Sequence, residues 1–326
     1  MTSLVRTTQT KSSAFDAVVH ATHQAAGGAN PLVEPWRELL WYLACLDSVW
    51  IEAGGTGRAL RQRLSAREMR VEGDLGWVIG PGFQIHCFLD EWHAMHPRLV
   101  PSAAIPDGFR ITDQAGTSLL SLGVDSPADR FALRILARAH ALDRQWRCDT
   151  RTGEDRATRV SRHLQQLSAW LEAGARPLEV GDIAEVCGWL TLTPERLHRR
   201  GRAMRAEPEH IPLFLQTVAE QALAVRVLTG TGGLAQCCEG VFDRTAYDGN
   251  GWLELVADGA CFRLDPATVH SAWVLSRCDA DRAWHQLRLY DAEGGAILLM
   301  ESLPVPGCGE HPIWRALIGA VSAPTA

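Results

Sequence analysis

The side chains of this chain that could do chemistry are histidines, cysteines and a dense group of arginines. His20 and His23 lie three residues apart, so a helix would present both imidazoles on one face, as in half of a metal site. We interpret them as surface or packing histidines. The sequence shows no nucleophile–base pair and no metal-ligand spacing, so its residues alone do not indicate an enzyme.

The nine cysteines include no Cys-x-x-Cys pair and are odd in number. This usage is typical of a reducing compartment with free thiols rather than of a disulfide framework. Cys237 and Cys238 are adjacent, but neighbouring residues of a strand point to opposite faces of its sheet. We therefore expect two structural thiols there and no redox pair.

The arginines are densest in a segment that resembles a helix-turn-helix, VGDIAEVCGWLTLTPERLHRRGRAMR. Its second expected helix holds five arginines between Arg196 and Arg205, and such a helix could read DNA. The net charge of −6 and the pI of about 6.1 give no global case for a nucleic-acid partner, and no second unit is present in the sequence. DNA binding through residues 180–205 is kept as an alternative.

Length and composition indicate a folded protein of more than one unit. At 326 residues the chain exceeds the usual size of a single core, which favours two domains or two fused repeats. Its 46% hydrophobic and 21% charged residues predict a packed core. The sequence has neither the apolar core of a secretory signal nor an apolar run long enough to span a bilayer, so we expect a cytoplasmic protein without a membrane partner.

Two parts of the chain share one order of elements. The Asp-x-x-Gly turn of an expected hairpin at Asp113–Gly116 recurs at Asp291–Gly294, an offset of 178 residues. Upstream, His93 falls on His270 and His86 on Arg263, an offset of 177. Strand, strand, hairpin and terminal helix follow each other in both parts. We predict an internal duplication, with repeats at 13–147 and 181–326 and a linker with a helix at 148–180.

Apolar spacing and turn residues predict the elements of each repeat. Residues 57–73 are rich in arginine and are expected to form a polar connector between the first helix and the first strands. A hairpin is expected around Gly80–Gly82 and a helix from Ser126 onward. Further helices are expected at 13–26, 35–46, 161–174, 180–190, 193–207, 210–223 and 311–321.

The strand-rich tract near the C-terminus resembles the C-terminal repeat of the HemS/HmuS/ChuS family of bacterial cytoplasmic haem-utilisation proteins. The first repeat matches more weakly, and together the resemblance covers roughly residues 35–146 and 180–320. The landmarks that carry it are Gly233, Gln236, Gly240, Trp252, Trp273, Leu289–Ala292, Gly294, Pro306, Gly307, Glu310 and Trp314–Leu317, with Gly76, Phe88, Leu89, Trp92 and His93 in the first repeat.

The resemblance implies an α+β fold of two pseudo-symmetric repeats, each a large twisted antiparallel sheet with flanking helices. It also implies one haem bound in a cleft between the halves, which is passed on or, in some members, degraded. We therefore expect a haem-binding protein for haem trafficking or iron acquisition, with protein partners in haem transfer. Haem degradation is implied by the resemblance alone, because its chemistry resides mainly in the haem and the reductant.

The sequence departs from the family at the positions that hold the iron. The family's ligand histidine follows an Asp-plus-aliphatic pair, and the matching position here is Ala184, which cannot bind iron. Cys187 lies one helical turn further on and could offer a thiolate. On the opposite wall, His86 replaces a family arginine, which makes it our first candidate for the axial ligand of haem iron, although it could equally be a core residue.

The remaining cofactor-binding candidates are cations and histidines of the sheets. Arg277 takes the place of a family lysine thought to contact a propionate, and arginine is a good fork for a carboxylate. Arg263 is the repeat equivalent of His86. His93 and His270 occupy equivalent positions, which favours a structural role for both. The loss of the ligand at Ala184 supports one more alternative, a degenerate family member that acts as a scaffold or binds another planar ligand.

Overall fold

A computed structural model of the protein describes residues 34–44, 46, 48–64, 68–98, 108–142, 165, 180–188, 203–279, 282–307 and 309–322. The expected helix at 13–26, with His20 and His23, lies outside these residues. So does the expected helix at 161–174, apart from residue 165.

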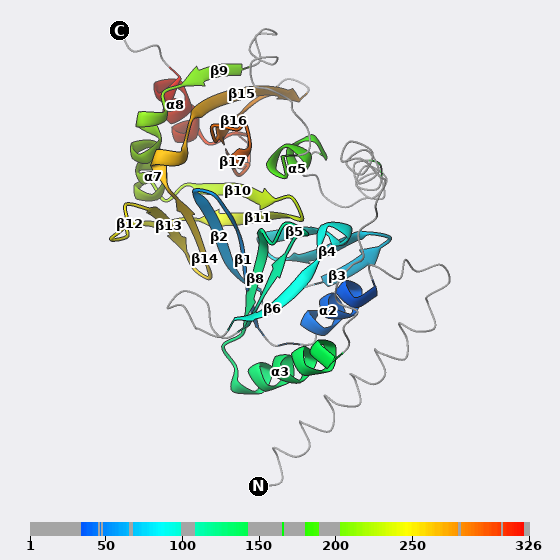
Figure 1. Ribbon diagram of the computed structural model, residues 1–326. Coiled ribbons are helices and arrows are strands. Elements are labelled where there is room, and N and C mark those ends of the chain that lie inside the picture. The colour runs from blue at the N-terminus through cyan, green and yellow to red at the C-terminus, as the bar shows by residue number, and fades with distance from the viewer. Residues whose placement is uncertain are drawn as a thin grey trace.

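The strands of the described residues form two antiparallel sheets (Figure 1). The eight strands of sheet A, in spatial order, are β12 (Arg244–Tyr247), β13 (Leu253–Ala257), β14 (Ala260–Leu264), β2 (Arg58–Leu64), β1 (Val49–Gly55), β8 (Ser118–Gly123), β7 (Gly108–Thr112) and β6 (Ala94–Arg98). The nine strands of sheet B are β3 (Glu68–Glu72), β4 (Leu75–Gly80), β5 (Phe83–Phe88), β11 (Leu234–Val241), β10 (Ala224–Thr231), β17 (Ala296–Ser302), β16 (Arg282–Tyr290), β15 (Ser271–Asp279) and β9 (Ala203–Ala206).

Each sheet combines strands from both parts of the chain. The meander β3–β5 pairs with β11 and so extends sheet B, while the meander β12–β14 pairs with β2 and extends sheet A. The strands β1–β8 of the first repeat correspond in order to β10–β17 of the second. When each strand is exchanged for its counterpart, the strand order of sheet A becomes that of sheet B, to which β9 adds an edge strand. The predicted two-repeat α+β fold is confirmed, with the additional finding that the two repeats exchange their meanders.

The exchange is fixed by equivalent backbone hydrogen bonds. At the end of β5, the Phe88 N–H donates to the Gly233 carbonyl at 3.0 Å, and at the end of β14 the Asp265 N–H donates to the Gly57 carbonyl at 2.8 Å. In both places the meander of one repeat is anchored to the first hairpin turn of the other. The two sheets are therefore one cooperative assembly rather than two separate domains joined by a linker.

The inner faces of the two sheets pack against each other around a buried amide pair. Gln236 on β11 donates from Nε2 to the Gln62 Oε1 on β2 at 2.8 Å, and its own Oε1 accepts from the Ala53 N–H of β1 at 3.0 Å. These contacts satisfy polar groups that would otherwise be buried at a cost of about 1–3 kcal/mol each. Gln236, one of the family landmarks, thus serves the sheet–sheet interface.

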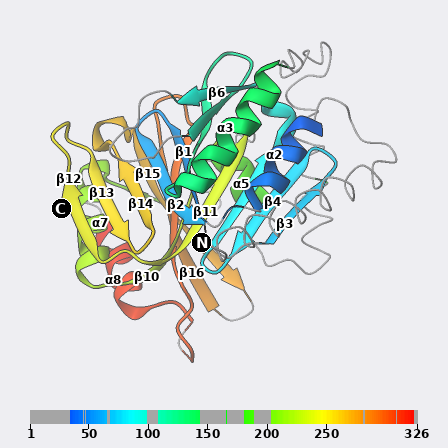
Figure 2. The same ribbon diagram turned by 90° about the horizontal axis from the view of Figure 1, so that it is seen from below.

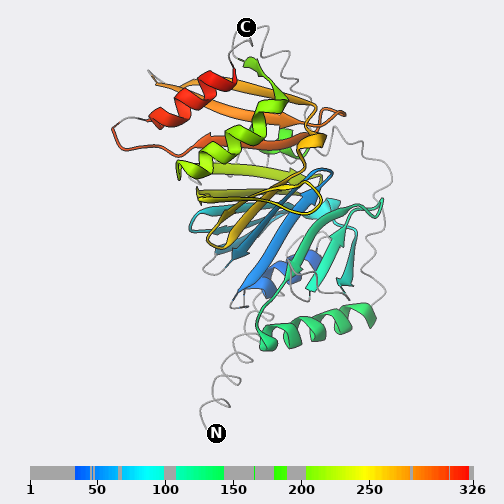
Figure 3. The same ribbon diagram turned by 90° about the vertical axis from the view of Figure 1, so that its left-hand side faces the viewer.

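Two pairs of helices complete the inner core at opposite ends. At one end, α7 (Ile211–Glu220) and α8 (Pro312–Val321) lie beside sheet B; at the other, α2 (Glu34–Ala44) lies near β3, with α3 (Pro127–Leu142) next to α2 (Figures 2 and 3). Edge-to-face aromatic contacts lie in both regions, Phe214–Trp314 with centroids 5.4 Å apart and Trp36–Trp92 at 5.6 Å. The two contacts are not repeat equivalents, since Trp314 lies on α8 whereas Trp92 lies between β5 and β6.

The remaining helices are short. They are α5 (Val180–Val186), η1 (Leu89–Glu91), η3 (Pro208–His210) and η4 (Pro266–Thr268). Only α5 covers the outer face of sheet B among the described elements, on the side of β17 opposite to α7 and α8 (Figure 1). No helix of the described residues is long and apolar enough to cross a membrane.

Several sequence predictions are confirmed, and two are wrong. The helix at 35–46, the hairpins and the terminal helix are present. The expected connector at 57–73 contains strands β2 and β3, because Leu60 and Leu64 alternate with arginines that face outward. The expected helix at 193–207 lies partly outside the described residues, and its end is the edge strand β9, which carries Arg205. The described part of this arginine-rich segment is thus not a DNA-reading helix.

Candidate functional site

The outer face of sheet B, which we call the α5-side face, carries a hydrophobic cluster separate from the inner core. Side chains from β4, β5, β11, β10, β17, β16, β15, β9 and the α5 segment form this buried cluster. Its members are Leu75, Trp77, Phe88, Ile183, Val186, Cys187, Ala203, Leu228, Ala235, Cys237, Trp273, Leu275, Tyr290, Ala296 and Leu299. These side chains are buried, so a flat ligand could lie against this aromatic, apolar face only after the groups that cover it move.

His86 belongs to this face. It lies on β5 in register with Trp77 on one side and Ala235 on the other, and Ala235 is in turn opposite Gly230 on β10. The side chain is 1% exposed. Burial lowers the pKa of His86 to about 4, so the imidazole is neutral at neutral pH and carries a nitrogen lone pair.

Helix α5 forms the neighbouring wall of the same face. Val186 packs directly over Gly230. A Cβ added to Gly230 would lie 2.9 Å from the Cγ1 of Val186. Ala184, the position of the family's ligand histidine, is fully buried and offers no donor atom. Cys187 donates from its thiol to the Leu234 carbonyl at 3.6 Å, and burial raises its pKa well above the ordinary thiol value. The thiol is thus protonated, which disfavours the thiolate chemistry that we considered for it.

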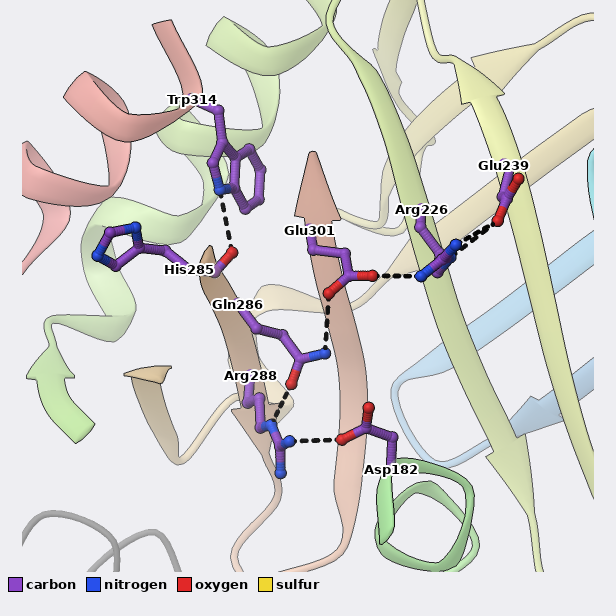
Figure 4. A network of polar contacts seen from close by, with 8 residues as sticks. All are labelled: Asp182, Arg226, Glu239, His285, Gln286, Arg288, Glu301 and Trp314. Atoms are coloured by element: carbon purple, nitrogen blue, oxygen red, sulfur yellow. Dashed lines mark hydrogen bonds and ion pairs between the residues drawn. The ribbon is translucent and has the colours of Figure 1, made fainter. Parts of the chain in front are cut away.

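A network of ion pairs connects α5 to the centre of sheet B (Figure 4). Arg288 on β16 pairs with Asp182 of α5 at 2.6 Å and with Glu185 one helical turn further on. The Tyr290 hydroxyl also donates to Glu185. All of these side chains are buried, so the two arginine contacts hold α5 on the sheet with charge-assisted bonds in a low-dielectric environment.

The network continues across three more strands. Arg288 donates to Gln286 at 2.6 Å, and Gln286 in turn reaches Glu301 on β17 at 3.5 Å. Arg226 on β10 bridges Glu301 at 2.5 Å and Glu239 on β11 at 2.6 Å (Figure 4). Each of the two arginines is therefore neutralised by two carboxylates, and neither is available to an anionic ligand.

The other predicted site residues are spread over the molecule. Arg277 lies on β15 opposite Trp284, and only its backbone is described. The backbone N–H of His93 donates to Thr112 at 2.8 Å and that of His270 to Tyr290 at 2.9 Å. These equivalent bonds hold the strand that follows each histidine, in line with the structural role that their matching positions favour.

Arg263 lies apart from His86, although the two are repeat equivalents. It is on β14 of sheet A, where it pairs with Asp248 at 2.5 Å and Glu254 at 2.9 Å and stacks over Trp252 at 5.1 Å. The outer face of sheet A is half-exposed and charged. The exchange of meanders puts Arg263 and His86 in different sheets, so they do not converge on one ligand.

The two adjacent cysteines occupy opposite faces, as predicted. Cys237 packs on the α5-side face and Cys238 in the inner core, and both are free thiols. Burial raises the pKa of Cys238 to about 12. Met300 of β17 packs in the inner core rather than on the α5-side face, so its thioether is not available there as a ligand.

The landmarks near the C-terminus have structural roles. Glu310 is buried and accepts from the backbone N–H of His285 at 2.7 Å and pairs with its ring at 2.9 Å. The indole N–H of Trp314 donates to the His285 carbonyl at 3.1 Å (Figure 4). Both residues lock α8 onto β16. Sequence reasoning did not single out Arg226 and Arg288, although arginines on otherwise apolar strands are a readable signal of a buried ion pair.

The overall architecture is that of solved haem-utilisation proteins. The heme-degrading enzyme ChuS of Escherichia coli O157:H7 superposes with a TM-score of 0.66 at 17% sequence identity, covering 88% of this chain and 85% of ChuS. Holo-PhuS, a heme-binding protein from Pseudomonas aeruginosa, superposes with a TM-score of 0.64 at 17% identity, covering 89% of this chain and 86% of PhuS. No curated protein sequence matches the chain.

The sequence itself matches one family model. Residues 194–320 match the haemin-degrading HemS.ChuX domain. These residues, about two fifths of the chain, thus resemble a HemS.ChuX domain, and the chain as a whole has the two-repeat fold of ChuS and PhuS. The resemblance inferred from the sequence is confirmed.

Proposed function

We propose that the protein binds haem on the α5-side face, with the imidazole of His86 as an axial ligand of the iron, and that it serves haem trafficking or iron acquisition. The observation that carries the proposal is a neutral histidine in an apolar, aromatic sheet face beside the helix that holds the family's ligand position. The HemS.ChuX domain and the fold shared with the heme-binding protein PhuS support it.

The residues of this face fit an iron porphyrin in two respects. A neutral imidazole is the common axial donor to haem iron, and the low pKa of His86 keeps it neutral over the physiological range. Trp77 and Phe88 offer the apolar contacts that a macrocycle requires. When bound, haem would supply the redox and oxygen chemistry, while this chain would bind, orient and shield it.

This chain differs from the family in the element that would supply the axial ligand. Ala184 removes the donor from α5, and His86 supplies one from the sheet. In this chain His86 would hold the iron from the sheet, and α5 would contribute apolar contacts such as Val186. Because His86 is 1% exposed, the side chains that cover it must move for haem to enter, and we expect slow association.

The test is a titration of the purified protein with hemin, followed through the Soret band. We expect a saturable one-to-one spectrum that changes its axial-ligand signature in His86→Ala, while Cys187→Ala leaves it unchanged. His270→Ala, which removes an exposed histidine, is the matched control. A titration without saturable binding would refute haem binding and favour the scaffold alternative. Saturable binding with an unchanged His86→Ala spectrum would refute the ligand assignment.

A further inference from the structure

Arg58 lies where the two sheets meet, at the edge of the α5-side face. It begins β2 of sheet A, but its side chain crosses to sheet B, where Nε and Nη2 donate to the Gly230 carbonyl at 3.3 and 3.0 Å. Its Nη1 lies 3.5 Å from the Thr56 carbonyl. Gly230 is in the row that runs through Ala235 to His86, so the backbone that holds the guanidinium lies two strand spacings, roughly 10 Å, from the His86 backbone.

The guanidinium of Arg58 lacks a carboxylate partner among the described residues. Its hydrogen bonds go to backbone carbonyls, which leave the positive charge uncompensated. The half-buried Arg226 and the buried Arg288 of the α5-side face each pair with two carboxylates. A half-buried arginine is costly to desolvate without a counter-ion, and burial lowers the pKa of Arg58. Asp291 and Cys187 lie close enough to act on its charge but outside ion-pair distance.

The fold does not require a cation at this position. Arg58 is in register with Leu264 of β14, and its repeat equivalent is Leu234, in register with Cys87 of β5. Leu234 is fully buried and packs in the inner core. The same backbone position thus accepts a leucine in one repeat. The hairpin does not need the positive charge of Arg58 in order to fold.

We infer that Arg58 binds a carboxylate of the ligand on the α5-side face. For haem, this makes Arg58 an anchor for a propionate, and the inference rests on the proposed function. The Gly230 carbonyl that holds the guanidinium belongs to the same row as Ala235 and His86, so a planar ligand over that row would extend toward Arg58. Arginine presents a planar fork of N–H donors that matches a carboxylate in shape and charge.

Sequence reasoning selected Arg277 as the propionate contact and passed over Arg58, because β2 was expected to be a connector. The two assignments do not exclude each other, since a porphyrin of this type carries two propionates. Arg58 is the one whose guanidinium the structure describes.

The experiment compares hemin with hemin dimethyl ester, in which the propionates carry no charge. Affinities are measured by Soret titration for the wild type, Arg58→Leu and Arg63→Gln. Leucine is the residue that the fold accepts at the equivalent position, so we expect Arg58→Leu to fold. Arg63 is exposed on the same strand and lies away from the α5-side face, so Arg63→Gln removes an equal charge without touching that face.

We expect Arg58→Leu to weaken hemin binding about tenfold or more, as for loss of a hydrogen bond to a charged group. Its affinity for the dimethyl ester should match that of the wild type, and Arg63→Gln should match the wild type with both ligands. Equal hemin affinity in Arg58→Leu and the wild type would overturn the inference. So would an equal loss for hemin and ester, since that pattern means that Arg58 acts only as a clamp between β2 and β10.

Iron-free protoporphyrin IX separates this inference from the proposed function. Suppose that protoporphyrin binds to the wild type and that His86→Ala does not change the spectrum of bound hemin. The assignment of His86 as axial ligand then fails, while the comparison of Arg58→Leu with the wild type still tests whether Arg58 binds a propionate. If neither hemin nor protoporphyrin binds saturably to the wild type, both proposals are refuted.

Discussion

The outer faces of the two sheets have the same backbone and opposite chemistry. His86 on β5 stands opposite Ala235, and its repeat equivalent Arg263 on β14 stands opposite Ala59. On the next strand of each meander, Trp77 corresponds to Glu254. The α5-side face of sheet B is buried and aromatic, whereas the outer face of sheet A consists of half-exposed arginines, acids and stacked tryptophans.

This difference teaches how a duplicated fold acquires a single site. Duplication creates two equivalent faces, and the inner core is the same kind of apolar packing at both ends. The register dictates only which residues face outward, and not whether they are apolar. In this protein one face carries apolar residues and a helix held by ion pairs, while the other carries a polar surface. The asymmetry therefore lies in the outward side chains and in the helix that covers one face.

The largest expected contrast concerns Arg288 and its repeat equivalent Arg110. Arg288→Met leaves Asp182 and Glu185 buried without their counter-ion and should lower the free energy of unfolding by about 3–5 kcal/mol. Arg110 is exposed, so Arg110→Met should change it by less than about 0.5 kcal/mol. Urea denaturation of both variants measures the contrast. Equal losses of stability in the two variants would mean that the ion pairs of Arg288 contribute no more than the exposed Arg110.

The pH dependence of stability should differ between the faces. The folded state holds His86 neutral down to pH about 4, whereas the unfolded chain takes up its proton near 6.5. The unfolded state thus binds more protons between these values, so stability is fully present above pH 6.5 and is lost as pH falls toward 4. The loss amounts to about 3 kcal/mol.

His86→Gln should remove this part of the pH dependence, because glutamine does not titrate. The measurement is the free energy of unfolding from pH 4 to pH 7.5, with His270→Gln as the control, since that histidine is exposed. The wild type and His270→Gln should show parallel curves. A His86→Gln curve parallel to both would show that His86 is not buried as a neutral base.

The smallest of the three contrasts concerns two glycines at the ends of the first strand of each repeat. At Gly230 an added Cβ would lie 2.3 Å from the Leu234 carbonyl oxygen and 2.9 Å from Val186, so Gly230→Ala should destabilise by about 1–3 kcal/mol. At the equivalent Gly54 the nearest atom is 3.5 Å away, and Gly54→Ala should be close to neutral. Thermal melts of both test this. A neutral Gly230→Ala would mean that α5 does not pack on β10.

Much of the fold was readable because its signals are local. The hairpin turns at Asp113–Gly116 and Asp291–Gly294 and the amphipathic helices each depend on a few neighbouring residues. Strand β2 was missed because only its inward residues, such as Leu60 and Leu64, are apolar, and its arginines masked the alternation. The pairing of β5 with β11 and of β14 with β2 was not predictable, because pairing partners far apart in sequence leave no periodic signal.

The sequence by itself determined the duplicated order of elements, the family resemblance, and the presence of His86 and Ala184 at positions where relatives carry an arginine and a histidine. Tertiary structure alone decided that the meanders are exchanged, so that His86 and Arg263 end in different sheets, and that Arg58 of one sheet reaches the face of the other. The physical reason is that local propensities act within a few residues, whereas burial, ion pairing and pKa depend on which distant segments share a face.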